Sequence, residues 1–114
     1  MSKFVELQEL YAKEMTEKIG MKSVDADLLK AISKACGPSI YTTDGSKVSC
    51  SDKTEIDRVK KNFLIKKLGL KDEPKLDEAL VEVCEEMGKS NRNKYRPIFY
   101  YLLVIKFKKE SMFK

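Results

Sequence analysis

The sequence predicts an all-α protein, a single compact domain of about five helices arranged around an apolar helix near the C-terminus. Three observations predict this fold. Apolar residues recur at helical spacing in four separate stretches. Glycine and proline residues stand at the ends of those stretches, where helices commonly stop or start. A fifth stretch, Ile98 to Phe107, is apolar on every side except at Lys106, so it has to be buried on every side.

The bulk composition fits one globular domain. The chain has 114 residues, of which 42% are hydrophobic and 36% are charged, and a chain of this length can bury roughly two-thirds of its unfolded surface. The longest uncharged apolar run, Pro97 to Ile105, is well short of the roughly 20 residues that span a bilayer. The first ten residues place acids among apolar residues, unlike a secretory signal. We therefore expect a cytoplasmic protein with no membrane partner.

Two helices are expected in the first third of the chain. The first should run from Ser2 to Ile19, where apolar residues share one arc, and Gly20 can end it. The second should run from Ser23 or Val24 to Cys36, with Ser23 as its N-cap. Gly37-Pro38 should stop it, because proline cannot donate the next helical hydrogen bond.

Residues 38–51 are expected to form a long loop, which one turn of helix at Ser39 could begin. Ile40, Tyr41 and Val48 should pin this loop to the core. The β-branched residues around Asp44-Gly45 leave a short hairpin open as an alternative, although two residues on each side cannot stand alone as a sheet.

The third helix opens with a capping box. Asp52 can accept a hydrogen bond from the amide of Glu55, whose side chain can reach back to the amide of Asp52. The helix should end at Gly69, and Leu70 is placed for the hydrophobic contact that accompanies a glycine C-cap.

Two helices complete the fold. The fourth should start near Pro74 with Asp72 as its cap and end at Gly88. Its apolar stripe comprises Leu76, Ala79, Leu80, Val83, Cys84 and Met87. The fifth should begin between Asn93 and Arg96, because Pro97 fits best in a first turn. It should fade by about Lys109, leaving residues 110–114 as a loose tail.

The three cysteines, Cys36, Cys50 and Cys84, contain no CxxC pair. An odd count without close spacing in a cytosolic protein predicts reduced thiols. Cys36 and Cys84 lie on apolar helix faces and are expected in the core. Cys50 lies in a polar loop and is the one candidate for a reactive thiol.

The residue types argue against an enzyme. The chain has no histidine, which is the usual general base near neutral pH and the commonest metal ligand. Three dispersed cysteines do not make a closed zinc site, and no glycine-rich phosphate loop is present. The carboxylates of the fourth helix are expected on its solvated face. We therefore expect no catalytic residues, no metal and no cofactor.

Positive charge gathers in the second half of the chain, where residues 58–114 hold 15 basic and 8 acidic side chains. Two basic clusters result, at residues 58–71 and 89–96. The candidate contacts to an anion or a nucleic acid are Arg58, Lys61, Lys66, Lys89, Arg92, Lys94 and Arg96.

Each cluster has a structural alternative. Lysines scattered around a helix, as in the first cluster, more often serve solubility, and the stems of Lys60 and Lys67 can cover apolar surface. The second cluster precedes a helix N-terminus, where the helix dipole disfavours positive charge. Either the acids Glu82, Glu85 and Glu86 compensate that charge internally, or a phosphate binds there.

Four segments resemble a known family. They are Gly37-Pro38-Ser39-Ile40-Tyr41, Cys50-Ser51-Asp52, the run from Asp57 to Leu70, and Lys94-Tyr95-Arg96 with Phe99 to Leu103. In this order they are similar to the DUF2853 family, a domain of unknown function, from about Ser2 to Lys109. The resemblance implies a bacterial, all-helical, single-domain protein, and it implies no activity and no functional residues. Pro97 departs from the alanine expected at that position.

The function that these features favour is a small helical interaction module that binds another protein or associates with itself. The alternative is a protein that binds nucleic acid, a phosphate or another anion through the two basic clusters.

Overall fold

The computed structural model describes residues 3–17, 19–20, 22, 24–42, 47–88 and 94–113. The helices along the chain are α1 (Lys3–Glu17), α2 (Ala26–Cys36), η1 (Gly37–Tyr41), α3 (Lys53–Val59), η2 (Lys60–Lys67), α4 (Pro74–Met87), α5 (Arg96–Lys106) and η3 (Glu110–Phe113). Within these ranges no strand forms, and an isolated bridge joins Lys47 to Tyr95. The predicted all-α single domain of about five main helices is confirmed.

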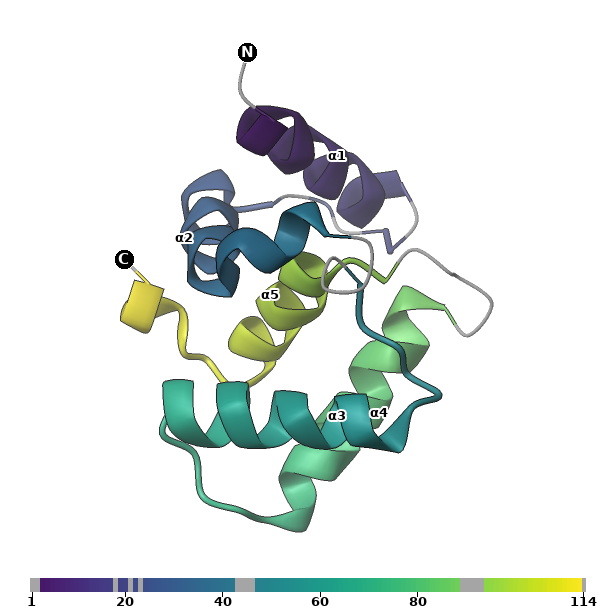
Figure 1. Ribbon diagram of the computed structural model, residues 1–114, viewed down its shortest axis with the longest axis vertical. Helices are drawn as coiled ribbons and strands as arrows, with labels where there is room; N and C mark the ends of the chain where they lie inside the picture. Colours follow the sequence, from purple (N-terminus) through teal and green to yellow (C-terminus); the bar gives the residue numbers. More distant parts are fainter. Residues whose placement is uncertain are drawn as a thin grey trace.

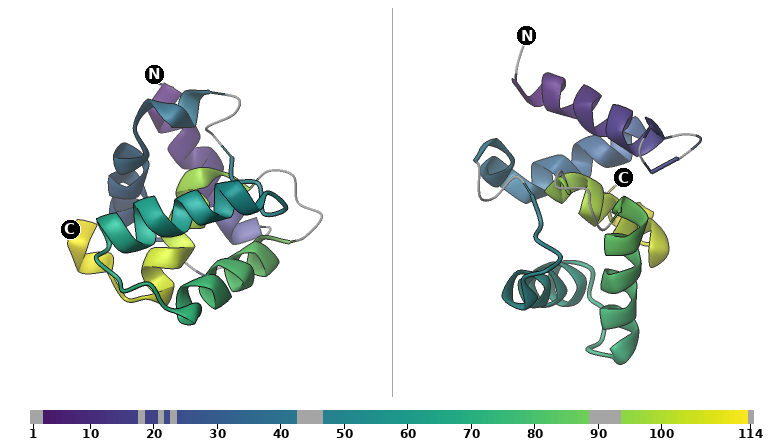
Figure 2. Two further views of the ribbon diagram at one scale, coloured as in Figure 1. Left: turned by 60° about the horizontal axis from the view of Figure 1, so that its bottom comes forward. Right: turned by 90° about the vertical axis from the view of Figure 1, so that its right-hand side faces the viewer.

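Helix α5 is the centre of the molecule, as its apolar sequence predicts. It packs against α1, α2 and α4, and Figure 1 shows it between α1 and α2 on one side and α3 and α4 on the other. The side views agree with this arrangement (Figure 2). The buried residues of α5 are Pro97, Ile98, Phe99, Tyr101, Leu102, Leu103 and Val104. The Tyr101 hydroxyl also accepts a hydrogen bond from the amide of Asp25 at 2.9 Å, which ties α5 to the start of α2.

The start of α2 differs from the prediction. The helix begins at Ala26, and Asp25 is its N-cap, with the carboxylate accepting from the amide of Leu28 at 3.1 Å. Ser23, the predicted cap, lies outside the described residues. Aspartate and serine cap helices about equally well, so tertiary contacts decide between them. The bond from Asp25 to α5 fixes Asp25 in place.

Helix α3 continues directly into η2, a π-helix. Asp52 caps α3 as predicted, accepting from the amides of Thr54 and Glu55. In η2 the amide of one residue bonds to the carbonyl five residues earlier, as Leu68 does to Phe63 at 2.9 Å. Such π-turns are rare and occur often at functional sites.

Helix α4 has its predicted apolar stripe facing α5, but its cap differs. Glu73 occupies the N-cap position without a side-chain hydrogen bond. Asp72, the predicted cap, forms an ion pair with Lys60 at 3.0 Å, and Asp77 joins the same ammonium. The Lys60 ammonium therefore meets carboxylates, where we expected it to reach water.

The connecting segments are more ordered than expected. Helix η1 begins the long loop, and Ile40 and Val48 are buried as predicted. Tyr41 is 43% exposed, so the prediction that it pins the loop is wrong. The proposed Asp44-Gly45 hairpin falls outside the described residues. The tail also differs from the expected loose end, because η3 forms a turn whose Phe113 ring lies 6.4 Å from Phe63.

The cysteines contradict the prediction of three reduced thiols. Cys50 and Cys84 form a disulfide, with their Cα atoms 6.0 Å apart, whereas Cys36 keeps its thiol and is partly buried. Spacing along the chain gave no sign of this pair because its partners are 34 residues apart. The fold places Cys50, which precedes α3, next to Cys84 in α4.

None of the helices in the described part of the chain is both long and apolar enough to cross a membrane.

Candidate functional site

A partly buried polar network surrounds Arg96, the first residue of α5. Its guanidinium pairs with the carboxylate of Glu55 on α3, and the two side chains are 15% and 18% exposed. It also donates to the Tyr100 hydroxyl at 3.0 Å and to the carbonyl of Lys47 at 3.5 Å. Tyr100 stands one turn further along α5, where i,i+4 side chains meet. Arg96 therefore joins the segment before α3, the first turn of α3 and the start of α5.

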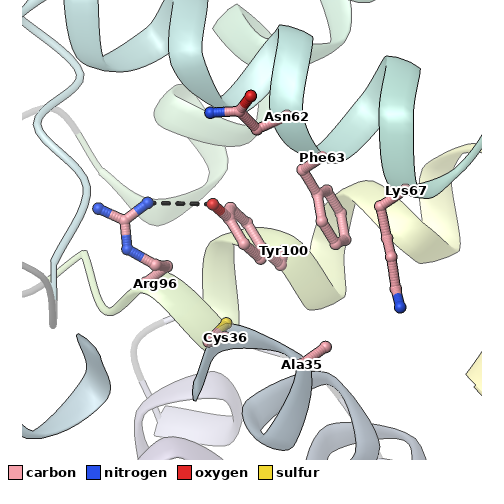
Figure 3. Close-up of a pocket in the computed structure, with 7 residues that line it drawn as sticks. All are labelled: Ala35, Cys36, Asn62, Phe63, Lys67, Arg96 and Tyr100. Carbon is pink, nitrogen blue, oxygen red and sulfur yellow. Dashed lines mark hydrogen bonds between the residues drawn. The ribbon is translucent and has the colours of Figure 1, made fainter. Parts of the chain in front are cut away.

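Next to this network lies a pocket of about 290 Å³ between three helices (Figure 3). Its lining residues are Ala35 and Cys36 from α2, Asn62, Phe63 and Lys67 from η2, and Arg96 and Tyr100 from α5. Pockets between helices with apolar walls and a few polar groups are the usual form of a small-ligand site. This pocket is therefore the candidate functional site.

The centre of the pocket wall is aromatic. The rings of Phe63 and Tyr100 stack at 4.0 Å between centroids and 15° between planes. The side chains of Arg96 and Lys67 lie on opposite sides of this pair (Figure 3). The Lys67 ammonium is also 5.8 Å from the centroid of the Phe113 ring, which is within the range of a cation–π contact. The wall thus combines an aromatic pair with a cation at each end.

The two cations differ in their charge balance. Arg96 is already paired with Glu55. Burial alone would lower the pKa of Arg96, but Tyr100 and Glu55 outweigh it and raise the pKa, so Arg96 stays charged. Lys67 takes part in none of the ion pairs found among the described residues. The net positive charge at the pocket therefore comes from Lys67.

Cys36 is a wall residue and a poor nucleophile. Burial raises its pKa to about 12, although the charge of Arg96 opposes the shift. At neutral pH the thiol is therefore almost entirely protonated, whereas reactive cysteines have lowered pKa values. The prediction for Cys50, the candidate reactive thiol, is wrong because that residue is in the disulfide.

Of the predicted contact residues that the structure describes, Arg96 alone lines the pocket. Arg58 and Lys66 are exposed on α3 and η2, and Lys61 pairs with Asp57 at 3.1 Å. Lys94 is 8% exposed. Lys89 and Arg92 lie outside the described residues. The predicted anion site at residues 89–96 therefore stays a prediction.

The internal partners of the basic residues also differ from the prediction. We expected Glu82, Glu85 and Glu86 to compensate residues 89–96. In the structure Glu82 and Glu86 hold Lys106, at 2.8 and 3.2 Å. The predicted capping box is not completed, because the amide of Asp52 donates to the carbonyl of Ser49 and the Glu55 carboxylate pairs with Arg96. The i,i+4 spacing of Arg96 and Tyr100 indicates that these two side chains meet on α5. Nothing in the sequence indicates that either residue lies next to η2.

The pocket offers binding groups: two cations, an amide, a phenol, a protonated thiol and apolar walls. None of the described lining residues carries a carboxylate. In the described part of the chain no three His, Cys, Asp or Glu side chains are grouped to hold a metal ion.

No curated protein matches this chain. A family model described as "Protein of unknown function (DUF2853)" matches residues 10–111. The matched range covers every helix that lines the pocket and confirms the resemblance seen in the sequence. This chain therefore belongs to the DUF2853 family.

Proposed function

We propose that this chain is a non-catalytic binding domain whose pocket takes a small anion with an apolar part, such as a simple carboxylate or phosphate ester. One observation carries the proposal. The ammonium of Lys67 stands beside an aromatic-walled pocket, and no described carboxylate pairs with it. An anionic group on a ligand would supply that missing charge.

The remaining lining residues support the same ligand class. The Asn62 amide can donate to an anionic oxygen. The rings of Phe63 and Tyr100, which line the pocket, can contact an apolar part of the ligand. The volume of about 290 Å³ lies at the lower end of ligand pockets, which favours a small molecule.

The first test is an NMR titration of the labelled protein with benzoate and with its neutral isostere benzamide, at low ionic strength. Benzoate should shift the signals of Ala35, Phe63 and Tyr100, and benzamide should shift them less. Lys67→Gln should weaken benzoate binding about 3-fold, the effect of a solvent-accessible charge pair of about 0.7 kcal/mol.

Lys30→Gln is the matched control, because Lys30 is an exposed lysine of α2 outside the pocket lining. It makes the same change in net charge, so it should leave the affinity within error. If millimolar benzoate shifts no pocket signal, or if both variants weaken binding equally, the pocket is not the anion site.

A second candidate function is binding to a partner protein or to a second copy of the chain. Among the residues that the structure describes, five large hydrophobic side chains are more than a third exposed: Val5, Tyr41, Val81, Ile105 and Met112. They belong to five different elements, which favours small contacts over one continuous apolar interface. Light scattering after size exclusion, over a range of concentrations, tests self-association. A mass that stays monomeric throughout would argue against it.

Nucleic acid is an alternative anionic ligand. The exposed side chains of Arg58, Lys61 and Lys66 could contact its phosphates. Binding that is undetectable at roughly 50 mM salt would exclude it, because phosphate contacts are strongest at low salt. We also propose the cytoplasm of a bacterial cell as the location. Thiol trapping in intact cells tests this location by measuring whether Cys50 and Cys84 are reduced or disulfide-bonded. A mostly reduced pair would support the cytoplasm, because disulfides are usually transient in the cytosol.

A further inference from the structure

We infer that Phe113, in the C-terminal turn η3, is a positioning residue for the pocket. Its ring holds the Lys67 ammonium at one end of the pocket wall, so that the cation is in place before a ligand arrives. Phe113 is not among the lining residues, and it therefore acts on the ligand through Lys67. The inference rests on the proposed function for its effect on affinity, and on the structure alone for the position of Lys67.

Three aromatic rings from three elements lie together beside the pocket. The ring of Phe63 in η2 stacks on that of Tyr100 in α5, and the Phe113 ring of η3 lies 6.4 Å from Phe63, with 26° between the planes. The two rings that contact Phe63 each carry a cation. The guanidinium of Arg96 lies 5.8 Å from the centroid of Tyr100, and the Lys67 ammonium lies 5.8 Å from that of Phe113. Phe113 thus gives Lys67 the kind of support that Tyr100 gives Arg96.

The fold fixes the place of the Phe113 ring. After α5, the backbone turns through Lys108, whose φ of 55° lies in the left-handed region. The amide of Lys109 returns to the carbonyl of Val104 at 2.9 Å, as in a Schellman turn. The chain then packs η3 against α2, and Phe113 is partly buried against the core (Figure 1). A lysine in the left-handed region persists where its surroundings hold it there, so the ring is a fixed support.

Lys67 is the lining residue that gains most from such a support. Its side chain is long and exposed, and it takes part in none of the ion pairs found among the described residues. A lysine without a fixed partner samples many rotamers, and a ligand that binds it loses that entropy. The contact with Phe113 restricts the ammonium in advance. It also leaves N–H groups of the ammonium able to donate to an anion, so an anion should bind more tightly when the ring is present.

The chain offers a matched control for Phe113. The Lys75 ammonium of α4 lies 5.9 Å from the centroid of the Phe107 ring. Phe107 is also partly buried and packs on the core, and the pocket lining includes neither Phe107 nor Lys75. Replacing either phenylalanine with leucine keeps an apolar side chain and removes the ring. The two variants therefore differ in which lysine loses its aromatic partner.

The first readout is the NMR signal of the Lys67 ε-CH2 group, recorded without ligand. A methylene held over the face of an aromatic ring is shifted upfield by the ring current. The Lys67 signal should lie upfield of the signal of Lys66, an exposed neighbour. It should move towards the Lys66 signal in Phe113→Leu, and it should keep its place in Phe107→Leu and in Phe113→Tyr, which retains the ring. A Lys67 signal that Phe113→Leu leaves unchanged would overturn the inference.

The second readout is the affinity for benzoate, from the titration of the pocket signals. Phe113→Leu should weaken binding about 2-fold, at the lower end of what fixing a long side chain in advance contributes. Phe107→Leu and Phe113→Tyr should stay within error of the wild type. In a Lys67→Gln background, Phe113→Leu should cause no further loss, because it acts through Lys67. An equal loss in both backgrounds would show that Phe113 does not act through Lys67 and would overturn the inference.

The two readouts separate this inference from the proposed function. If benzoate shifts no pocket signal while the Lys67 signal responds to Phe113→Leu, the proposed function fails together with the effect on affinity, and the position of Lys67 stands. If benzoate binds the wild type and Phe113→Leu equally well, the inference is overturned and the proposed function stands.

Discussion

The pair formed by Glu55 and Arg96 should be one of the costliest polar contacts to break in this protein. Replacing Glu55 with alanine leaves the guanidinium of Arg96 in a site where it is only 15% exposed. Removing one partner of a buried ion pair costs about 3–5 kcal/mol. Because both side chains keep some contact with water, we expect the lower end, about 3 kcal/mol. For a chain of this length that corresponds to a fall in Tm of roughly 12 °C.

Urea unfolding followed by circular dichroism measures this cost, with Glu82→Ala as the matched control. Glu82 also binds a cation, Lys106, at 2.8 Å, but its side chain is 58% exposed. Exposed pairs contribute less than about 1 kcal/mol, so the control should be close to wild type.

Arg96→Met and the double variant complete a thermodynamic cycle for the same pair. The coupling energy between Glu55 and Arg96 should be at least about 1.5 kcal/mol, in the middle of the range for residues in contact. A Glu55→Ala cost no larger than that of Glu82→Ala, with coupling near zero, would refute the reasoning.

Three further predictions concern the disulfide, the thiol of Cys36 and the core. Reducing the disulfide should lower the free energy of unfolding by about 4 kcal/mol, the chain-entropy value for a loop of this length, given that its cysteines are 34 residues apart. Equal urea midpoints with and without dithiothreitol, or three reactive thiols in the unreduced unfolded chain, would contradict it. Because the pKa of Cys36 is raised from 9.0 to about 12, the folded state keeps its proton while the unfolded state loses it. Stability should therefore be full below pH 9 and fall as the pH rises towards 12, by up to about 1.4 kcal/mol per pH unit. Cys36→Ala should show a shallower decline in urea unfolding between pH 8 and 11, and identical declines would count against the assignment. Leu103→Ala should cost about 3–5 kcal/mol because Leu103 is fully buried in α5. Ile105→Ala, at an exposed site on the same helix, should cost under about 1 kcal/mol, and similar costs for the two would show that α5 is not central.

The helices and the core were predictable from the sequence because their signals are local. Apolar spacing, the Gly-Pro stop after α2 and proline in the first turn of α5 each act within a few residues, and the structure follows them. The capping predictions were less successful for a specific reason. More than one residue near each helix start could serve as the N-cap: Ser23 or Asp25 for α2, and Asp72 or Glu73 for α4. Contacts made by other parts of the chain decide between them. Lys60, for example, holds Asp72 away from the cap of α4.

The pocket was beyond prediction because each of its polar residues already had a satisfactory local explanation. Glu55 fits a capping box with Asp52, and Arg96 fits a basic loop before a helix. The structure pairs these two residues across 41 positions of sequence, and it pairs Cys50 with Cys84 across 34. Both long-range pairs lie at the start of α3, because Cys50 precedes its N-cap and Glu55 is in its first turn. The arrangement of that segment therefore depends on contacts between distant parts of the chain, which no local pattern indicates.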